Sequence, residues 1–174
     1  MRKDMGTMNI EKEMLSLAGE YAVASELCRE VIYAQLTLAH RKRVDLLVAT
    51  EKAMLNIQVK TKQNKEWPLI KGISGDDILL IFVDYENKPP GERPDFYILT
   101  ARDWDYFVKH GWISKFIGKN NKNKENKYEL NEENCPIHLG RDDKPNWKGC
   151  NLDASDITRC KEKWDKVHVL LEKK

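Results

Sequence analysis

Hydrophobic and polar residues alternate through the segment 44–62, and this alternation predicts a β-hairpin. If Glu51 and Lys52 form the turn, Thr50 faces Ala53 and the apolar residues of the two strands pair with one another. The predicted apolar pairs are Val48 with Leu55, Leu46 with Ile57 and Val44 with Val59. A shift of one residue would mix apolar and polar side chains on both faces, so the pattern selects this register. Because Glu-Lys lacks the Asn-Gly or Asp-Gly sequence typical of a two-residue turn, a longer loop with the same pairing is the alternative.

The opposite face of the predicted hairpin gathers polar side chains. The same register places Asp45 opposite Gln58 and Arg43 opposite Lys60. Opposed residues in an antiparallel pair have Cβ atoms roughly 5 Å apart, and two opposed cations are unfavourable without a nearby anion. A carboxylate, or a phosphate of a bound substrate, would supply that anion. The alternative interpretation is an ordinary solvated sheet face.

The segments around the hairpin predict a mixed α/β domain. Apolar residues at helical spacing predict a helix over 11–29, and strand-forming residues predict strands over 31–38 and 96–100. The expected core face of the first helix consists of Met14, Leu17, Ala18, Tyr21, Ala22 and Cys28. The continuous apolar run 78–83 is typical of a strand buried on both faces, and a short helix is expected over 101–110. This order of elements favours a sheet with helices packed against it.

One set of residues resembles a known family. An acidic residue on a first helix, then Asp, then Glu or Gln two residues before Lys on the next strand is the signature of the PD-(D/E)XK nuclease superfamily. The matching residues in this chain are Glu20, Asp45, Gln58 and Lys60. The resemblance spans Met14 to His110. Val44 stands where the family pattern has proline, and Gln58 stands where it has Asp or Glu, as in the Gln-x-Lys variant.

The resemblance implies a fold, an activity and a metal site. The expected fold is α/β, with a restriction-endonuclease-like mixed central sheet flanked by helices. The expected activity is that of a Mg²⁺-dependent deoxyribonuclease that hydrolyses phosphodiester bonds by metal-activated water, as an endonuclease. The implied Mg²⁺ ligands, with Mn²⁺ as a substitute ion, are Asp45, the side-chain oxygen of Gln58, the carbonyl of Val59, and Glu20.

Lys60 has a separate implied role, which is to orient or deprotonate the attacking water and to stabilise charge in the transition state. With Gln58 in place of an acid, two protein carboxylates remain, which favours a single well-held ion. The alternative is a catalytically inactive nucleic-acid-binding or scaffold protein of the same fold.

The charged residues of the chain bear on nucleic-acid binding only through local clusters. Charged residues make up 33% of the chain but the net charge is only +2, so phosphate affinity has to come from clusters of cations. Such clusters lie at 40–43, 60–65 and 119–127. The expected nucleic-acid contacts are Arg41, Arg43, Lys62 and Lys65. DNA is the expected partner, with RNA as the alternative.

The remaining sequence suggests one domain with appended segments. We expect a core over 11–118, a flexible polar loop over 119–134 and a C-terminal extension over 135–174. A helix over 154–171 is expected to pack on the core or to form a homodimer contact. No apolar run approaches membrane-spanning length and the first residues lack an apolar leader segment, so a cytoplasmic protein without membrane contact is expected.

Other chemistries have little support in the sequence. Cys135 and His138 have the spacing of a zinc-ligand pair, but Cys150 and Cys160 do not form a second compact pair. Buried or incidental thiols are the favoured interpretation, and structural Zn²⁺ is not expected. There is no P-loop, dinucleotide fingerprint or nucleophile elbow, so the sequence does not indicate nucleotide-driven or serine-hydrolase chemistry.

Overall fold

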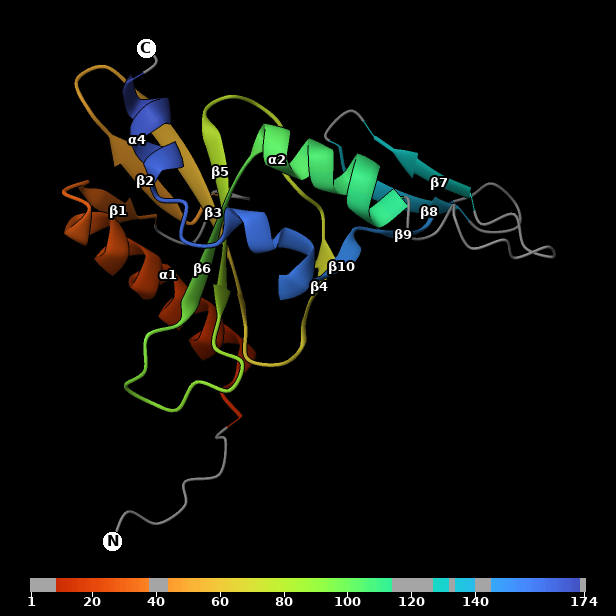
Figure 1. The fold of residues 1–174 in the computed structure, drawn as a ribbon, viewed down its shortest axis with the longest axis horizontal. Coiled ribbons are helices and arrows are strands. Elements are labelled where there is room, and N and C mark those ends of the chain that lie inside the picture. Colours follow the sequence, from red (N-terminus) through yellow and green to blue (C-terminus); the bar gives the residue numbers. More distant parts are fainter. Residues whose placement is uncertain (1–8, 38–43, 114–126, 132–133, 140–144, 173–174) are drawn as a thin grey trace, which may run out of the picture.

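The computed structural model describes residues 9–37, 44–113, 127–131, 134–139 and 145–172. Its centre is a five-stranded sheet in the order β1-β2-β3-β5-β6 (Figure 1). The strands are β1 (Ala34–Leu36), β2 (Leu46–Ala49), β3 (Met54–Lys62), β5 (Ile78–Asp84) and β6 (Asp95–Thr100). β3 and β5 run parallel, whereas the other neighbours are antiparallel. The predicted mixed sheet is therefore confirmed.

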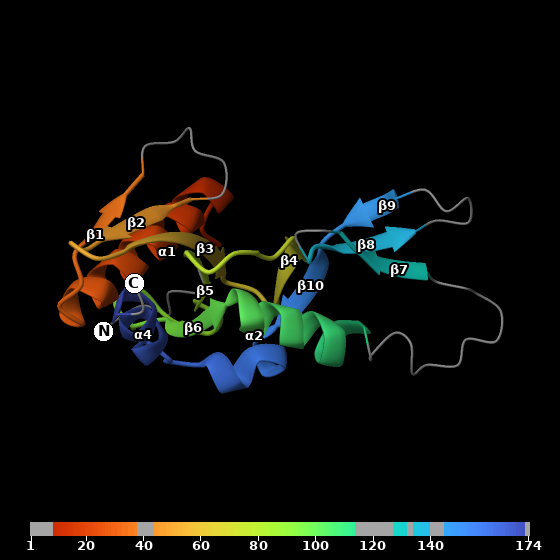
Figure 2. The same cartoon turned by 90° about the horizontal axis from the view of Figure 1, so that it is seen from above.

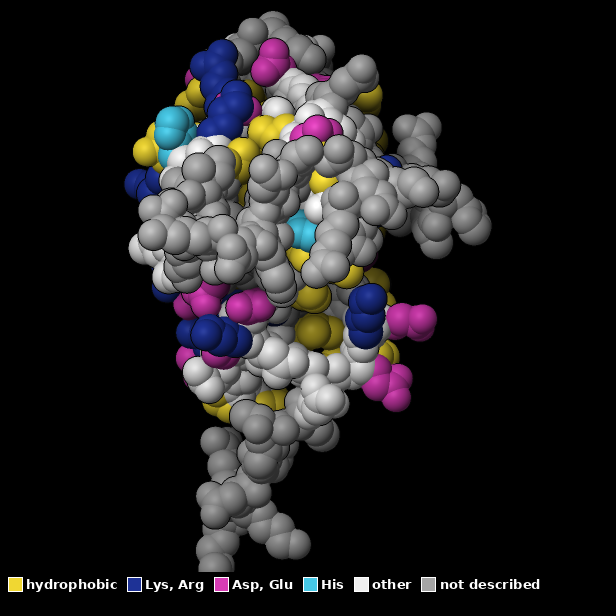
Figure 3. All heavy atoms as spheres, turned by 90° about the vertical axis from the view of Figure 1, so that its right-hand side faces the viewer, with side chains coloured by type: hydrophobic (Ala, Val, Ile, Leu, Met, Phe, Trp, Pro, Cys, Tyr) yellow, Lys and Arg dark blue, Asp and Glu magenta, His cyan; other side chains and the backbone are white. Residues whose placement is uncertain are grey.

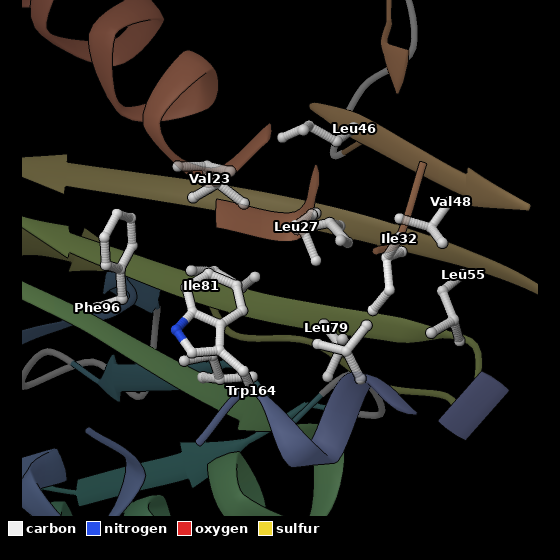
Figure 4. Close-up of a cluster of buried hydrophobic side chains, with 14 of the residues drawn as sticks. Val23, Leu27, Ile32, Leu46, Val48, Leu55, Leu79, Ile81, Phe96 and Trp164 are labelled. Carbon is white, nitrogen blue, oxygen red and sulfur yellow. The ribbon is translucent and has the colours of Figure 1, made fainter. Parts of the chain in front are cut away.

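Helices cover both faces of this sheet, as the predicted α/β class requires. On one face, α1 (Lys12–Arg29) and α4 (Asp165–Glu172) contribute to an apolar cluster with alternate residues of β2, β3, β5 and β6. Figure 4 shows Val23 and Leu27 of α1 entering this cluster together with Leu79, Ile81 and Trp164. The other face is covered by α2 (Ala101–Tyr106), its π-helical continuation η1 (Phe107–Trp112) and the 3₁₀ helix η2 (Ala154–Cys160).

Two smaller sheets extend the molecule away from α1 (Figure 2). β4 (Glu66–Ile70) pairs antiparallel with β10 (Cys150–Asp153), so the C-terminal extension is tied to the segment that follows β3. The strands β7 (Lys127–Leu130), β8 (Pro136–Leu139) and β9 (Pro145–Lys148) form a three-stranded antiparallel sheet. The segment 119–134 was predicted to be a flexible loop, but β7 lies within it and pairs with β8. The polar composition of this segment did not reveal the strand, because its pairing is a tertiary contact. No helix in the described segments is long and apolar enough to cross a membrane.

The hairpin register is confirmed where the two strands pair. Val48 faces Leu55, Leu46 faces Ile57, and the Thr50 N–H donates to the Ala53 carbonyl at 2.8 Å.

Two predicted elements have different bounds. The strand expected over 31–38 is shorter, because α1 runs to Arg29 and the chain then reverses at Val31, which has a φ of 61°. The helix expected over 154–171 is interrupted after Cys160. Lys161 is extended and bridges to Tyr97, and the Glu162 N–H donates to the Phe96 carbonyl at 2.9 Å, so the edge of β6 captures the backbone there.

The predicted core face of α1 is wrong at its large side chains, although Ala22, which was part of the prediction, packs against the apolar cluster. The buried residues of this helix are Leu15, Gly19, Val23 and Leu27, which recur every four residues. Met14, Leu17 and Tyr21, expected in the core, are exposed instead. The helix carries two apolar stripes, and the stripe containing Gly19 allows the closer approach to the sheet.

We expect Gly19→Ala to destabilise the protein. A Cβ atom at Gly19 would overlap the hydroxyl oxygen of Thr61 on β3, so either the helix or the strand has to move. Overpacking of this kind costs about 1–3 kcal/mol of unfolding free energy, which urea denaturation would measure. Ser16→Ala, an exposed change on the same helix, is the control. Adding Thr61→Ala should recover part of the loss, and a Gly19→Ala protein as stable as the parent would contradict this packing.

Candidate active site

The candidate site lies where β2 separates from β3. The two strands pair only as far as Leu46 and Ile57, and the Asp45 N–H also donates to the Ile57 carbonyl at 2.8 Å. Asp45 and Leu46 thus both face Ile57, which is the geometry of a β-bulge. The predicted pairing of Asp45 with Gln58 is consequently not part of the ladder, because the bulge ends the pairing one residue earlier. Beyond Ile57, the edge of β3 is no longer paired with β2.

Asp45 is held at this edge by hydrogen bonds on both sides. Its carbonyl accepts a bond from the Thr37 N–H at 3.0 Å, and its carboxylate Oδ2 accepts one from the Val59 N–H at 2.6 Å. In an extended strand, the N–H and the carbonyl of one residue point to the same edge. The Val59 carbonyl therefore leaves β3 at the edge where Asp45 lies. This edge presents oxygen atoms from a side chain and from the backbone.

Glu20 and Lys60 lie in the electrostatic field of Asp45. Burial raises the pKa of Glu20, the negative charge of Asp45 raises it further, and the positive charge of Lys60 opposes the rise. Burial lowers the pKa of Lys60, against the opposing effects of Asp45 and Glu20. Side chains from α1, from the start of β2 and from β3 therefore act on one another. No described residue lies within ion-pair distance of the Lys60 ammonium.

Gln58 and Lys60 share one face of β3, since side chains two residues apart on a strand point the same way. Both are half-buried, and Val59 between them packs into the apolar cluster under α1. In the parallel pairing with β5, Gln58 lies beside Leu80 and Lys60 beside Phe82. This face of β3 is therefore polar next to an apolar strand, which fits a site rather than a core position.

Lys60 also lines an open groove with a volume of about 760 Å³. The groove runs between the first half of α1 and the end of β3, and β4 forms its other side. Leu15 and Ser16 line it from the helix, and Pro68 and Leu69 line it from β4. A substrate in this groove would reach Lys60, whereas Glu20, Asp45 and Gln58 do not line it.

Of the predicted nucleic-acid contacts, the structure describes Lys62 and Lys65. Lys65 is exposed between β3 and β4, and Arg41 and Arg43 lie outside the described residues. Lys62 is only 3% exposed, and its ammonium pairs with Asp84 at 3.1 Å and with Glu86 at 2.6 Å. Its ammonium also lies 4.7 Å from the centre of the Trp67 ring. This placement argues against a DNA contact by Lys62.

The face at the end of the molecule that carries β7, β8 and β9 is drawn in Figure 3. Basic and acidic side chains of its described residues are interspersed there and do not form one basic patch. His138 of β8 stacks on Trp147 of β9, with ring centres 3.9 Å apart. Sequence reasoning did not find this aromatic pair, because it depends on the register of two strands far along the chain.

The described residues contain no group of three or more His, Cys, Asp or Glu side chains placed to hold a metal ion. Cys135, His138, Cys150 and Cys160 are all described, so the structure does not assemble them into a common zinc site. Burial raises the pKa of the Cys150 and Cys160 thiols, as expected for cysteines packed into a core. At the edge of β3, a metal ion would have to use the amide of Gln58 or the backbone in addition to Glu20 and Asp45.

Comparisons with known proteins add little to this geometry. No family model matches the chain, and no curated protein matches it. Among solved structures, a bacterial homing endonuclease aligns with 91% of this chain and with 93% of its own chain. The identity is 17% and the TM-score is 0.43. At that TM-score the superposition is loose, so the function has to be argued from the residues of the site.

Proposed function

We propose that this protein is a Mg²⁺-dependent deoxyribonuclease of the PD-(D/E)XK type that cuts within DNA strands. The observation that supports the proposal most is the mutual electrostatic influence of Glu20, Asp45 and Lys60, which come from three separate elements. Two carboxylates and one lysine at the unpaired edge of a strand have the composition that phosphodiester hydrolysis requires. Each residue alone would be an ordinary polar position.

The donor atoms at this edge fit Mg²⁺. The ion prefers oxygen ligands and keeps several waters, so two carboxylates with a carbonyl and an amide oxygen are sufficient. Glu20 and Asp45 would hold it, with the Val59 carbonyl and the Gln58 side-chain oxygen as neutral ligands. Burial raises the pKa of Glu20 and the negative charge of Asp45 raises it further, and a divalent cation between the two carboxylates would offset this second effect. When bound, Mg²⁺ would supply Lewis-acid activation of water and of the scissile phosphate.

Lys60 would act on the substrate directly. Its side chain lines the groove, and no described carboxylate pairs with its ammonium, so the positive charge is available to phosphate oxygens. Charge that develops on the phosphate in the transition state would be stabilised by this ammonium in a partly buried site. The lowered pKa of Lys60 also favours proton exchange with a water molecule held beside it.

We expect Gln58→Glu to tighten Mg²⁺ binding by about tenfold, because a third carboxylate would join the site and one favourable contact is worth roughly 1.4 kcal/mol. Titration calorimetry would measure the dissociation constant. Gln35→Glu makes the same chemical change at an exposed position of β1 and is the control. Equal affinity of the Gln58→Glu protein and the parent would show that position 58 does not face the metal.

The proposed activity is tested by incubating the protein with supercoiled, linear and branched DNA, and with RNA, in Mg²⁺, Mn²⁺ or EDTA. Cleavage of DNA that requires a divalent ion is the expected result. Binding of DNA without cleavage of any substrate would contradict the enzymatic proposal. It would instead support the alternative, an inactive nucleic-acid-binding protein in which Gln58 has weakened the metal site.

A further inference from the structure

Thr37 bonds to the backbone on both sides of the Asp45 Cα atom. It follows β1 directly, and its N–H donates to the Asp45 carbonyl at 3.0 Å. Its hydroxyl Oγ1 lies 2.5 Å from the Val44 carbonyl oxygen and 3.3 Å from the Asp45 carbonyl oxygen. Because a carbonyl oxygen only accepts hydrogen bonds, the hydroxyl has to donate, and the shorter contact is the one to Val44. Thr37 therefore holds two successive peptide groups, the one before Asp45 and the one after it.

Asp45 depends on such bonds because it lies in the bulge opposite Ile57, where the regular ladder of β2 and β3 ends. The peptide group before Asp45 has its N–H on the Ile57 carbonyl at 2.8 Å and its carbonyl on the Thr37 hydroxyl. With the peptide groups on both sides of its Cα atom held, the direction of the Asp45 side chain is fixed. In this direction the carboxylate Oδ2 accepts the bond from the Val59 N–H at 2.6 Å.

We propose that Thr37 is a positioning residue of the candidate active site, whose hydroxyl fixes the backbone of Val44 and Asp45 so that the Asp45 carboxylate stays at the unpaired edge of β3. The consequence for catalysis rests on the proposed function, in which Asp45 holds Mg²⁺. Thr37 acts through Asp45 and not on the ion or the substrate. Hydrogen-bond partners that orient a metal ligand typically contribute about 10- to 100-fold to metal affinity or to activity.

Amide hydrogen exchange tests the positioning itself, without metal or DNA. Thr37→Val replaces the hydroxyl by a methyl group of similar size and keeps the backbone N–H. We expect the Val59 amide to exchange about tenfold faster in this variant, because the Asp45 carboxylate that accepts its hydrogen bond is held less firmly. The amides of β5 in the same protein are the reference, since a general loss of stability would speed their exchange as well. Unchanged exchange at Val59 relative to β5 would overturn the proposal.

Mg²⁺ titration calorimetry and single-turnover DNA cleavage test the consequence for the site. We expect Thr37→Val to weaken Mg²⁺ binding and to slow cleavage by about tenfold or more. Thr37→Ser keeps the hydroxyl and should restore both quantities. Thr50→Val is the matched control, because the Thr50 hydroxyl also bonds to the backbone, at Lys52 and Ala53 in the turn at the opposite end of β2. This variant should leave Mg²⁺ affinity and cleavage unchanged.

The outcomes separate the role of Thr37 from the proposed function. A parent protein that neither binds Mg²⁺ nor cuts DNA would overturn the proposed function, while the exchange of the Val59 amide would still decide whether Thr37 positions Asp45. In a parent that does both, parental Mg²⁺ affinity and cleavage by the Thr37→Val protein would overturn the positioning role. A Thr37→Ser protein as impaired as Thr37→Val would also overturn it, because the hydroxyl would then not be the group that matters.

Discussion

Replacing Lys60 with methionine is expected to abolish DNA cleavage while leaving the protein at least as stable as the parent. Methionine keeps most of the apolar length of the lysine stem and removes the charge. Burial lowers the pKa of Lys60, which means that its charged form is less favourable in the folded protein than in water. Because the pKa of Lys60 is lower in the folded protein than in the unfolded chain, the neutral lysine contributes stability at a pH above its unfolded pKa. That stability is lost as the pH falls through its folded pKa, so the charged lysine destabilises the protein at neutral pH.

The two effects of Lys60→Met are measured separately. We expect the cleavage rate to fall by about 10²–10³-fold or more, the usual effect of removing one group that stabilises transition-state charge. If about 1 kcal/mol of the burial cost is relieved, the melting temperature should rise by about 2–4 °C. Lys52→Met, in the exposed turn between β2 and β3, is the control and should change neither quantity. A Lys60→Met protein that cuts DNA at the parental rate would remove Lys60 from the site.

The opposite effect on stability is expected for the substitution of Lys62, two residues further along β3. Lys62→Met should cost about 3–5 kcal/mol of unfolding free energy, because it removes one partner of a buried ion pair. Lys62 is 3% exposed and Asp84 is 7% exposed, and the substitution would leave the Asp84 carboxylate buried without its cation. Urea denaturation at neutral pH would measure the loss.

The pH dependence gives this prediction a second measurement. Burial already raises the pKa of Asp84, although hydrogen bonds from the Glu86 N–H and from Lys62 oppose the rise. Without Lys62 the pKa of Asp84 should rise further. A carboxyl group whose pKa is raised by folding contributes stability at a pH below its unfolded pKa, and this stability is lost as the pH rises through its pKa in the folded protein. The deficit of the Lys62→Met protein should therefore be smaller at acid pH than at neutral pH.

A matched double variant separates the charge from the packing. Adding Asp84→Leu to Lys62→Met removes both charges and should recover much of the lost stability. If Lys62→Met alone unfolds at the parental urea concentration, the ammonium does not hold Asp84, and the ion pair would not explain why this lysine is buried.

The hairpin could be predicted from the sequence because its information is local. Alternation in two adjacent strands fixes a register, and Leu46 and Ile57 face each other as that register requires. Glu20, Asp45 and Lys60 were found together for a related reason, since the order of acid, acid and lysine along the chain follows the order of three neighbouring elements. The bulge at Asp45 was not predicted, because it depends on the backbone leaving the ladder there.

Other features depend on contacts that no local pattern contains. Both stripes of α1 have helical spacing, and the choice between them is made by the fit of Gly19 against Thr61. Lys62 resembles an ordinary member of a basic cluster until β5 places Asp84 beside it. The break after Cys160 arises because the edge of β6 binds the backbone of residues 161 and 162. In each case the deciding partner lies more than 20 residues away in the sequence.

The most direct test of the proposed site is a plasmid-cleavage assay on three proteins in parallel: the parent, Asp45→Asn and Lys60→Met. Each is incubated with supercoiled DNA in Mg²⁺ and in EDTA. The proposed function predicts nicked and linear products from the parent in Mg²⁺ alone, and uncut DNA from both variants under all conditions. Equal cutting by the parent and by folded Asp45→Asn and Lys60→Met proteins would contradict the assignment of catalysis to this edge of β3.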